Sequence, residues 1–246
     1  MLAMVRPDGT LPVAMSGLRA CRLFAGMDDV SLEHVERALR PGSYRKGETI
    51  FHTGDFGDAL YVVGAGHVKI TIPSDDGAEP AILTTIGPGG FFGELALLDG
   101  ARRSATAVAM DSVTAMVLRR DAFDKLVEDQ PALRRALLVA LAAEIRRLTA
   151  QVQDLHFLDL PGRLARQLLR SLPGSVPSDD SDDALPAGEV RLPWPYTQAE
   201  LAGMIGGSRQ SVNRLLADFV ADGLLRFDGE ELVITDTRRL AAAARR

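Results

Sequence analysis

The N-terminal part of the chain carries apolar side chains at helical spacing. Positions 17–39 contain the apolar residues Leu18, Leu23, Phe24, Leu32, Val35 and Leu39. Spacings of three and four residues place such side chains on one face of a helix. Asp28, Asp29 and Ser31 are residue types that commonly begin helices, so the pattern predicts a second short helix that starts among them.

Between about residues 42 and 119 the pattern changes to short runs that alternate or are rich in β-branched residues. These runs occupy 49–51, 60–63, 68–72, 81–86, 105–109 and 115–118. Turn-forming residues separate them, as at Gly54-Asp55 and Pro88-Gly89. Many short strands at regular spacing predict a β-sandwich or a barrel-like roll.

Residues 121–157 then follow a helical pattern that is interrupted only near Pro131. Apolar residues step along it by three and four positions, at Leu138, Leu141, Ile145, Leu148, Val152 and Leu155. We call these six residues the heptad face. A period of 3.5 residues is typical of paired helices, so the heptad face predicts a dimer contact. The alternative is that this face packs on the β-roll of its own chain.

The next segments are a predicted helix over 161–172, which Pro161 opens, and a predicted solvated loop over 173–188. The loop is rich in Pro, Ser and Asp. Its aspartates could alternatively bind a metal, at Asp179, Asp180, Asp182 and Asp183. Carboxylates on a flexible loop rarely hold the geometry that a metal needs, so we favour the loop.

The strongest local pattern lies near the C-terminus. Thr197-Gln-Ala-Glu200 is a capping box that begins a helix, and Gly206-Gly207 ends it. Ser208 can cap the next helix. A helix, a short glycine turn and a second helix form a helix-turn-helix. The residues that follow, 223–235, have the alternation of a β-hairpin wing.

The second helix of this motif has two contrasting faces. The buried stripe is predicted to contain Val212, Leu215, Leu216, Phe219 and Val220. The opposite face carries Arg209, Gln210, Asn213 and Arg214. Arginine pairs with guanine, and glutamine or asparagine with adenine, so these residue types suit a recognition helix in the major groove. A solvated surface helix is the alternative, but the cap, turn and wing together favour DNA binding.

Composition narrows the class of protein. The chain has 246 residues, of which 46% are hydrophobic and 25% charged, as expected for a soluble protein with two small domains. It lacks the long apolar run of a membrane span, and residues 1–15 do not resemble a secretory signal, so we expect a cytoplasmic protein. Cys21 stands alone, which excludes an internal disulfide and a cysteine-held iron–sulfur cluster. The net charge of −5 still allows a local basic patch to bind DNA.

A second candidate site lies within the β-rich region. A short helical turn over 94–98 follows two glycine-rich positions and precedes Arg103-Ser104. A cation, a hydroxyl and a helix N-terminus are the groups that bind a phosphate, and Glu94 is an acceptor suited to a ribose hydroxyl. Taken alone, Glu94, Arg102 and Arg103 could equally be a surface ion-pair cluster.

These residues resemble the cAMP receptor / fumarate–nitrate regulator (CRP/FNR) family. The resemblance rests on Gly93-Glu94-Leu95 with Arg103-Ser104-Ala105, on the strands near 47–61, on Phe157-Leu158-Asp159 with Gly162-Arg163, and on the helix-turn-helix. It covers about residues 17–240 in order. It implies an α+β protein: an N-terminal cyclic-nucleotide-binding β-roll, or double-stranded jelly roll, over 1–130, a dimerisation helix and hinge over 131–158, and a winged helix-turn-helix over 159–246.

The resemblance also implies roles for individual residues. Glu94 would bind the ribose, with Gly93 beside it, and Arg103, Ser104 and the Ala105 amide would hold the cyclic phosphate. The base pocket would contain Ile70, Leu83, Thr84, Leu148 and Thr149. Family members that bind cAMP usually have a Thr-Ser pair where this chain has Leu148-Thr149, so we expect a weaker cAMP response. The implied DNA contacts are Thr197, Ser208, Arg209, Gln210, Asn213 and Arg214, with Gln210 where a glutamate is common.

The sequence therefore predicts a homodimeric transcription regulator that binds a near-palindromic site on double-stranded DNA and is modulated by cAMP. RNA polymerase is a further expected partner, and a membrane is not. A haem sensor on the same fold is one alternative, with His34, His52, His67 and His156 as possible ligands. Another nucleotide, ligand-independent binding or a cyclic-nucleotide-binding subunit of an enzyme are others. No nucleophile–base pair, metal-ligand spacing or Walker loop occurs in the sequence, so we do not expect an enzyme.

Overall fold

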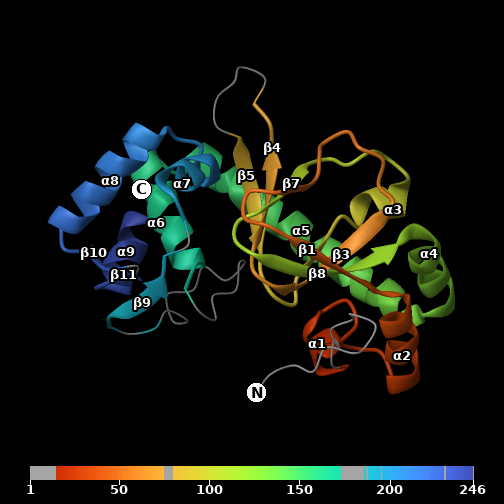
Figure 1. The fold of residues 1–246 in the computed structure, drawn as a ribbon. Coiled ribbons are helices and arrows are strands. Elements are labelled where there is room, and N and C mark those ends of the chain that lie inside the picture. Colours follow the sequence, from red (N-terminus) through yellow and green to blue (C-terminus); the bar gives the residue numbers. More distant parts are fainter. Residues whose placement is uncertain are drawn as a thin grey trace. The chain divides into compact units, whose positions relative to one another are not determined.

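The computed structural model describes residues 15–74, 80–172, 186, 188–194, 196–229 and 231–245. The chain forms two compact units, one that reaches Ala142 and one that begins at Ala143 (Figure 1). Helix α5, Pro131–Phe157, runs through this boundary. No described helix is both long and apolar enough to cross a membrane.

The first unit contains two antiparallel sheets of four strands each. One has the order β1-β8-β3-β6 and the other β2-β7-β4-β5. The strands are β1 Arg40–Tyr44, β2 Thr49–Phe51, β3 Ala59–Ala65, β4 Val68–Ile72, β5 Ala81–Ile86, β6 Phe91–Phe92, β7 Thr106–Ala109 and β8 Val113–Arg119. All six predicted runs are strands, so the predicted roll is confirmed. The sequence did not predict β1 and β6.

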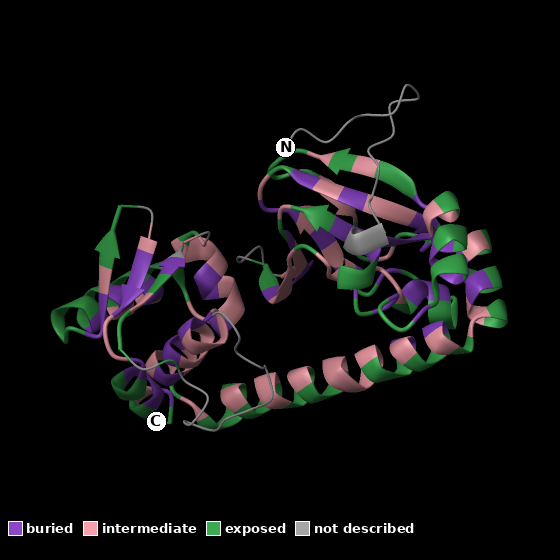
Figure 2. Cartoon of the chain, turned by 90° about the horizontal axis from the view of Figure 1, so that it is seen from below, coloured by how far each residue is buried: buried purple, intermediate pink, exposed green. Residues whose placement is uncertain are grey.

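Four short helices accompany the roll: α1 Met15–Ala20, α2 Asp29–Ala38, α3 Leu95–Asp99 and α4 Arg120–Asp129. Asp28 caps α2, since its Oδ1 accepts the Ser31 amide at 2.7 Å. Side chains of α1, α2 and α4 share a core with the first sheet and with Leu133 and Leu137 of α5. These two leucines are the buried residues of α5; the remaining described positions are half-buried or exposed (Figure 2).

The second unit contains the end of α5, the helices α6 Leu160–Arg170, α7 Gln198–Ile205, α8 Arg209–Ala221 and α9 Thr237–Ala243, and the strands β9 Val190–Pro193, β10 Leu225–Asp228 and β11 Glu231–Ile234. The strands form one antiparallel sheet in the order β10-β11-β9. A single apolar core joins this sheet to α6, α7, α8 and α9.

The C-terminal predictions are largely confirmed. The helix-turn-helix is α7 and α8, and the predicted hairpin is β10 and β11, which β9 extends by an unpredicted strand. One prediction about the buried stripe of α8 is wrong: Val220 is 40% exposed, because it lies near the solvent-facing end of the helix. The predicted loop over 173–188, including its aspartates, lies outside the described residues except for Pro186 and Gly188.

Candidate ligand site and DNA-binding surface

Arg103 is the centre of the candidate ligand site and points into the protein. Only 4% of the residue is exposed. Its Nη1 donates to the Gly93 carbonyl at 2.6 Å, and its Nη2 donates to the Ala59 carbonyl at 2.7 Å. Its guanidinium carbon lies 4.2 Å from the centre of the Phe51 ring and 5.9 Å from that of Tyr61. The predicted phosphate-binding arginine is therefore also part of the packed interior, which the sequence did not indicate.

Burial has an electrostatic consequence at this point. It lowers the pKa of Arg103 below its ordinary value and raises the pKa of Tyr61, since desolvation disfavours both charged forms. The guanidinium nevertheless stays a cation, because its pKa starts above 12. A buried cation that lacks a carboxylate hydrogen-bond partner among the described contacts favours a negatively charged ligand.

The Nε atom of Arg103 tests whether the site fits a phosphate. This atom is buried and has no hydrogen-bond partner in the described structure. Unpaired buried donors are costly, so such an atom is often completed by a ligand or water. A phosphate oxygen has the charge and the acceptor geometry that an arginine donor prefers. The residues present therefore fit a phosphate-containing ligand.

Gly93 occupies a position where only glycine fits. Its φ is +85°, which L-residues rarely adopt. A Cβ added there would lie 2.7 Å from Arg103 Nη1 and 3.2 Å from the Ala59 carbonyl oxygen. The missing side chain therefore lets Arg103 approach the backbone just before α3.

Arg120 fixes the position of α3, which the sequence analysis missed. Its Nη2 donates to the carbonyls of Gly57 and Ala96, each at 2.7 Å, and its Nη1 donates to that of Leu97 at 3.2 Å. Glu94 directly precedes α3 and is half-buried. Arg120 thus holds the turn that carries Glu94, from a position that only the tertiary contacts reveal.

The predicted base-pocket residues of the roll lie on two neighbouring strands. Ile70 of β4 pairs with Thr84 of β5, and Thr71 pairs with Ile82, so Leu83 is the extra residue of a β-bulge. Bulges change the direction of side chains and occur often next to binding sites. The structure thus brings Ile70, Leu83 and Thr84 together. Ser104 is exposed and Ala105 is buried at the step that follows Arg103.

Leu148 and Thr149 lie on α5, in the second unit. The Thr149 hydroxyl donates to the Ile145 carbonyl of its own helix at 2.9 Å. Five of the six residues of the heptad face are between 37% and 68% exposed in the single chain: Leu138, Ile145, Leu148, Val152 and Leu155. The heptad face is therefore not used to pack on the roll, whereas Leu133 and Leu137 are.

The helix-turn-helix has the predicted caps. Thr197 and Glu200 form the capping box, with the Thr197 amide donating to Glu200 Oε2 at 2.9 Å and the Glu200 amide donating to Thr197 Oγ1 at 3.2 Å. Gly206 ends α7 with a φ of +67°. Ser208 Oγ accepts the Ser211 amide at 3.1 Å and caps α8. The hydroxyls of Thr197 and Ser208 thus already stabilise the two helices.

The polar face of α8 is exposed as predicted, at Arg209, Gln210, Asn213 and Arg214. Arg214 lies 4.0 Å from Asp218, a weak surface pair. Asn213 has a firmer partner, because Gln198 Nε2 on α7 donates to its Oδ1 at 2.9 Å. Gln198 was not singled out from the sequence, since the contact joins two helices.

The possible haem ligands are engaged elsewhere or lie apart. His67 Nδ1 is 2.9 Å from Asp111 Oδ2, and His156 Nδ1 is 3.0 Å from the Val152 carbonyl. Among the described residues, no group of three His, Cys, Asp or Glu side chains is placed to hold a metal ion.

Comparisons with known proteins agree with this geometry. The family described as "Cyclic nucleotide-binding domain" matches residues 41–130, and "Crp-like helix-turn-helix domain" matches residues 162–243. The CRP-like cAMP-activated global transcriptional regulator of Mycobacterium tuberculosis is 35% identical over 223 residues, 91% of this chain and 96% of that protein. The cyclic AMP receptor protein of Thermus thermophilus is 31% identical over 198 residues, 80% of this chain and 83% of that protein.

A solved structure extends the comparison to the fold. The c-di-GMP responsive global regulator of Xanthomonas campestris superposes with a TM-score of 0.69 at 27% identity, over 85% of this chain and all of that chain. Sequence and structure thus agree on an effector domain followed by a DNA-binding domain. The chain belongs to the CRP/FNR family of transcriptional regulators, in which a cyclic nucleotide-binding domain precedes a DNA-binding helix-turn-helix.

Proposed function

We propose that this regulator is controlled by cAMP, bound in the roll at Arg103. The observation that carries the proposal is the buried Arg103 guanidinium, whose Nε lacks a partner. The cyclic phosphate would supply the negative charge and the acceptor oxygens that this cation lacks. The M. tuberculosis and T. thermophilus relatives are named as cAMP-dependent proteins, which supports the same ligand.

The other predicted ligand residues have complementary roles in the proposal. Ser104 and the Ala105 amide would hold the phosphate with Arg103. Glu94, next to Gly93, would accept the ribose hydroxyl, and Ile70, Leu83 and Thr84 would contact the base. Thr149 would contribute its hydroxyl from α5, and Leu148 an apolar contact.

Two copies of the chain would pair through the heptad face. A stripe of leucine, isoleucine and valine side chains that is exposed in the single chain is stabilised by burial against an identical stripe. Two recognition helices would then enter successive major grooves about 34 Å apart on a near-palindromic site. RNA polymerase is the further proposed partner, and the cytoplasm is the proposed location.

Within each recognition helix, Arg209, Gln210, Asn213 and Arg214 would reach base edges. Thr197 and Ser208, at the starts of α7 and α8, would lie next to the phosphates, as residues at helix N-termini commonly do on DNA. Gln210 both donates and accepts hydrogen bonds, whereas a glutamate only accepts, so its preferred base differs from that of relatives with glutamate.

Calorimetric titration of the purified protein with cAMP, cGMP and c-di-GMP tests the ligand. We expect cAMP to bind, and Arg103→Gln to bind it at least tenfold more weakly. Binding of c-di-GMP without binding of cAMP would overturn the assignment and would align this protein with the X. campestris regulator. Haem absorbance in the purified protein would instead support a gas sensor.

A further inference from the structure

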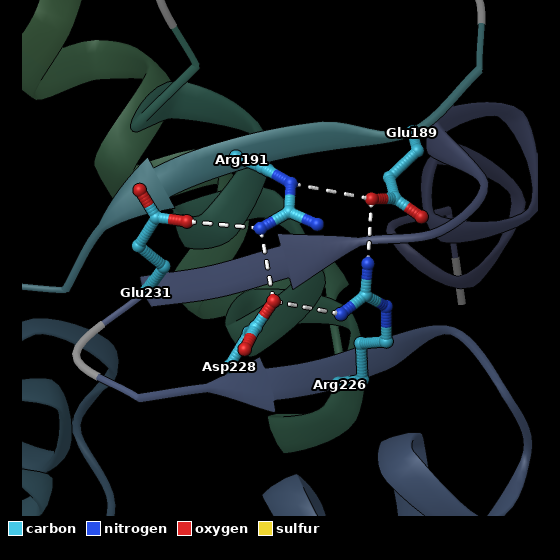
Figure 3. A network of polar contacts seen from close by, with 5 residues as sticks. All are labelled: Glu189, Arg191, Arg226, Asp228 and Glu231. Atoms are coloured by element: carbon cyan, nitrogen blue, oxygen red, sulfur yellow. Dashed lines mark hydrogen bonds and ion pairs between the residues drawn. The ribbon is translucent and has the colours of Figure 1, made fainter.

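The outer face of the wing carries a closed ladder of alternating charges. Five side chains from three strands take part: Glu189, Arg191, Arg226, Asp228 and Glu231 (Figure 3). We call them the wing ladder. Arg226 and Arg191 flank Val233 on the neighbouring strands, and Asp228 pairs with Glu231. Side chains two residues apart on a strand share a face, so the ladder covers one side of the sheet.

Every charge in the wing ladder is paired. Arg191 lies 2.9 Å from Asp228, 3.2 Å from Glu231 and 3.5 Å from Glu189. Arg226 lies 2.6 Å from Glu189 and 3.3 Å from Asp228. These arginines hold the pKa of Asp228 below its usual value, so its carboxylate stays charged throughout the neutral range.

The sign of the wing ladder matters for DNA. Three carboxylates and two guanidinium groups leave this surface with a net negative charge. All five side chains are between 41% and 51% exposed, so their charges act on anything that approaches. By contrast, the four polar residues of the α8 face are two arginines and two neutral amides, with no acid among them.

Transfer of a ladder arginine to a DNA phosphate would be unfavourable. If Arg191 left the ladder, Asp228 and Glu231 would face each other across paired strands without a cation between them. Like charges directly opposite on a sheet destabilise it. The same carboxylates would also repel the phosphate. The ladder therefore competes with DNA for both arginines.

We propose that the wing ladder keeps the wing off the DNA backbone and so ends the DNA-binding surface at the helix-turn-helix. The wing of this protein is then a boundary that limits the footprint, not a phosphate contact. The inference rests on DNA binding by α7 and α8.

The test neutralises two ladder acids and leaves both arginines in place. Asp228→Asn with Glu231→Gln removes two negative charges beside Arg191 and keeps side-chain size. DNA affinity is measured as a function of salt, on a fragment that the wild-type protein selects from randomised DNA. We expect tighter binding at low salt and a salt slope steeper by about one unit for each arginine released to a phosphate.

A matched control separates local from global charge. Asp124→Asn with Glu128→Gln makes the same change in net charge at exposed positions of α4 in the first unit, and should leave the slope unchanged. Exposed ion pairs contribute little to stability, so both double variants should fold, which thermal melts verify. Folded ladder variants with unchanged or weaker DNA binding would overturn the proposal.

A third variant separates this inference from its premise. Arg209→Gln on α8 should weaken binding to the selected fragment at least fivefold, since arginine pairs with guanine. If Arg209→Gln had no effect, DNA binding by the helix-turn-helix would be wrong. If only the ladder variant behaved like wild type, the boundary role of the wing alone would be wrong.

Discussion

Arg103 Nη1 donates a hydrogen bond of 2.6 Å to the carbonyl of Gly93, ten residues earlier in the chain. This bond ties the arginine proposed to bind the phosphate to the backbone that leads into α3. Ligand binding and the stability of the roll therefore depend on the same two residues. This coupling gives the first two predictions.

Gly93→Ala should destabilise the first unit and weaken cAMP binding. The new Cβ would meet Arg103 Nη1 at 2.7 Å and would also impose a φ of +85° on alanine. Overpacking of this kind costs about 1–3 kcal/mol. Gly100→Ala is the matched control, because its φ is +72° but nothing lies within 4 Å of the added atom. Urea unfolding should show a clearly larger loss for Gly93→Ala; equal losses would mean that the close approach is unimportant.

Arg103→Ala should abolish measurable cAMP binding and also lower stability. From the sequence, a pocket arginine outside the core was expected, so the fold should have been indifferent to its loss. The structure corrects this, because the change leaves the buried carbonyls of Gly93 and Ala59 without these donors. An unsatisfied buried acceptor costs about 1–3 kcal/mol.

Arg102→Ala is the control for Arg103→Ala. Arg102 is exposed, stacks on Phe56 at 4.1 Å and donates to the Gly54 carbonyl at 2.8 Å. Calorimetry and thermal melts should find this variant close to wild type. A loss of cAMP binding in Arg102→Ala but not in Arg103→Ala would assign the phosphate to the wrong arginine.

Ile145→Glu should convert a dimer into monomers. Ile145 is 64% exposed in the single chain, so the substitution disturbs no intrachain core and places a charge on the heptad face. Two such charges at a paired position repel each other. Sedimentation at micromolar concentration measures the change, and DNA binding should weaken with it. Arg146→Glu, at the exposed neighbouring position, should remain dimeric. A dimer that survives Ile145→Glu would exclude the heptad face as its contact.

Leu148→Thr should make DNA binding more dependent on cAMP. Leu148 is 37% exposed, and its burial against a partner helix would contribute roughly 1.5–3 kcal/mol to a ligand-free dimer. Threonine gives up that contact and offers a hydroxyl to the base, worth about 0.5–1.5 kcal/mol. DNA-binding isotherms with and without cAMP, at fixed salt, measure both effects. Wild-type protein that is silent without cAMP and rises a hundredfold with it would contradict this role of Leu148.

Gln198→Ala should relax base preference at the position that Asn213 reads. Gln198 Nε2 donates to Asn213 Oδ1 at 2.9 Å, which orients the amide of Asn213 on the recognition helix. In an Asn213→Ala background the same substitution should have no further effect, because there is no amide left to orient. Selection from randomised DNA with the two single variants and the double variant measures this coupling. Additive effects would mean that Gln198 acts independently of Asn213.

The local elements of this protein could be predicted because their determinants are close in sequence. Asp28, Thr197 and Ser208 accept amides three residues later, so residue type and spacing identify these helix starts. The same holds for Gly206, whose left-handed conformation ends α7. The resemblance to the CRP/FNR family added the order of these elements and the position of Arg103.

Tertiary structure decided the elements whose partners lie far away. Strand β1 contains Pro41 and Gly42, which locally indicate a turn, yet it pairs with β8 more than seventy residues later. Proline is tolerated there because β1 is an edge strand of its sheet. Strand β9 ends at Pro193 and is likewise an edge strand, paired with β11.

The sequence by itself determined that Arg103 and Gly93 belong to one site, but not that the arginine faces inward. That direction depends on the Ala59 carbonyl and the Phe51 ring, which β3 and β2 bring to it from more than forty residues away. The wing ladder has the same origin, since β9 joins Glu189 and Arg191 to the hairpin across a gap of some thirty-five residues. Side-chain direction is set by packing and by long-range pairing, and neither leaves a periodic trace in the local sequence.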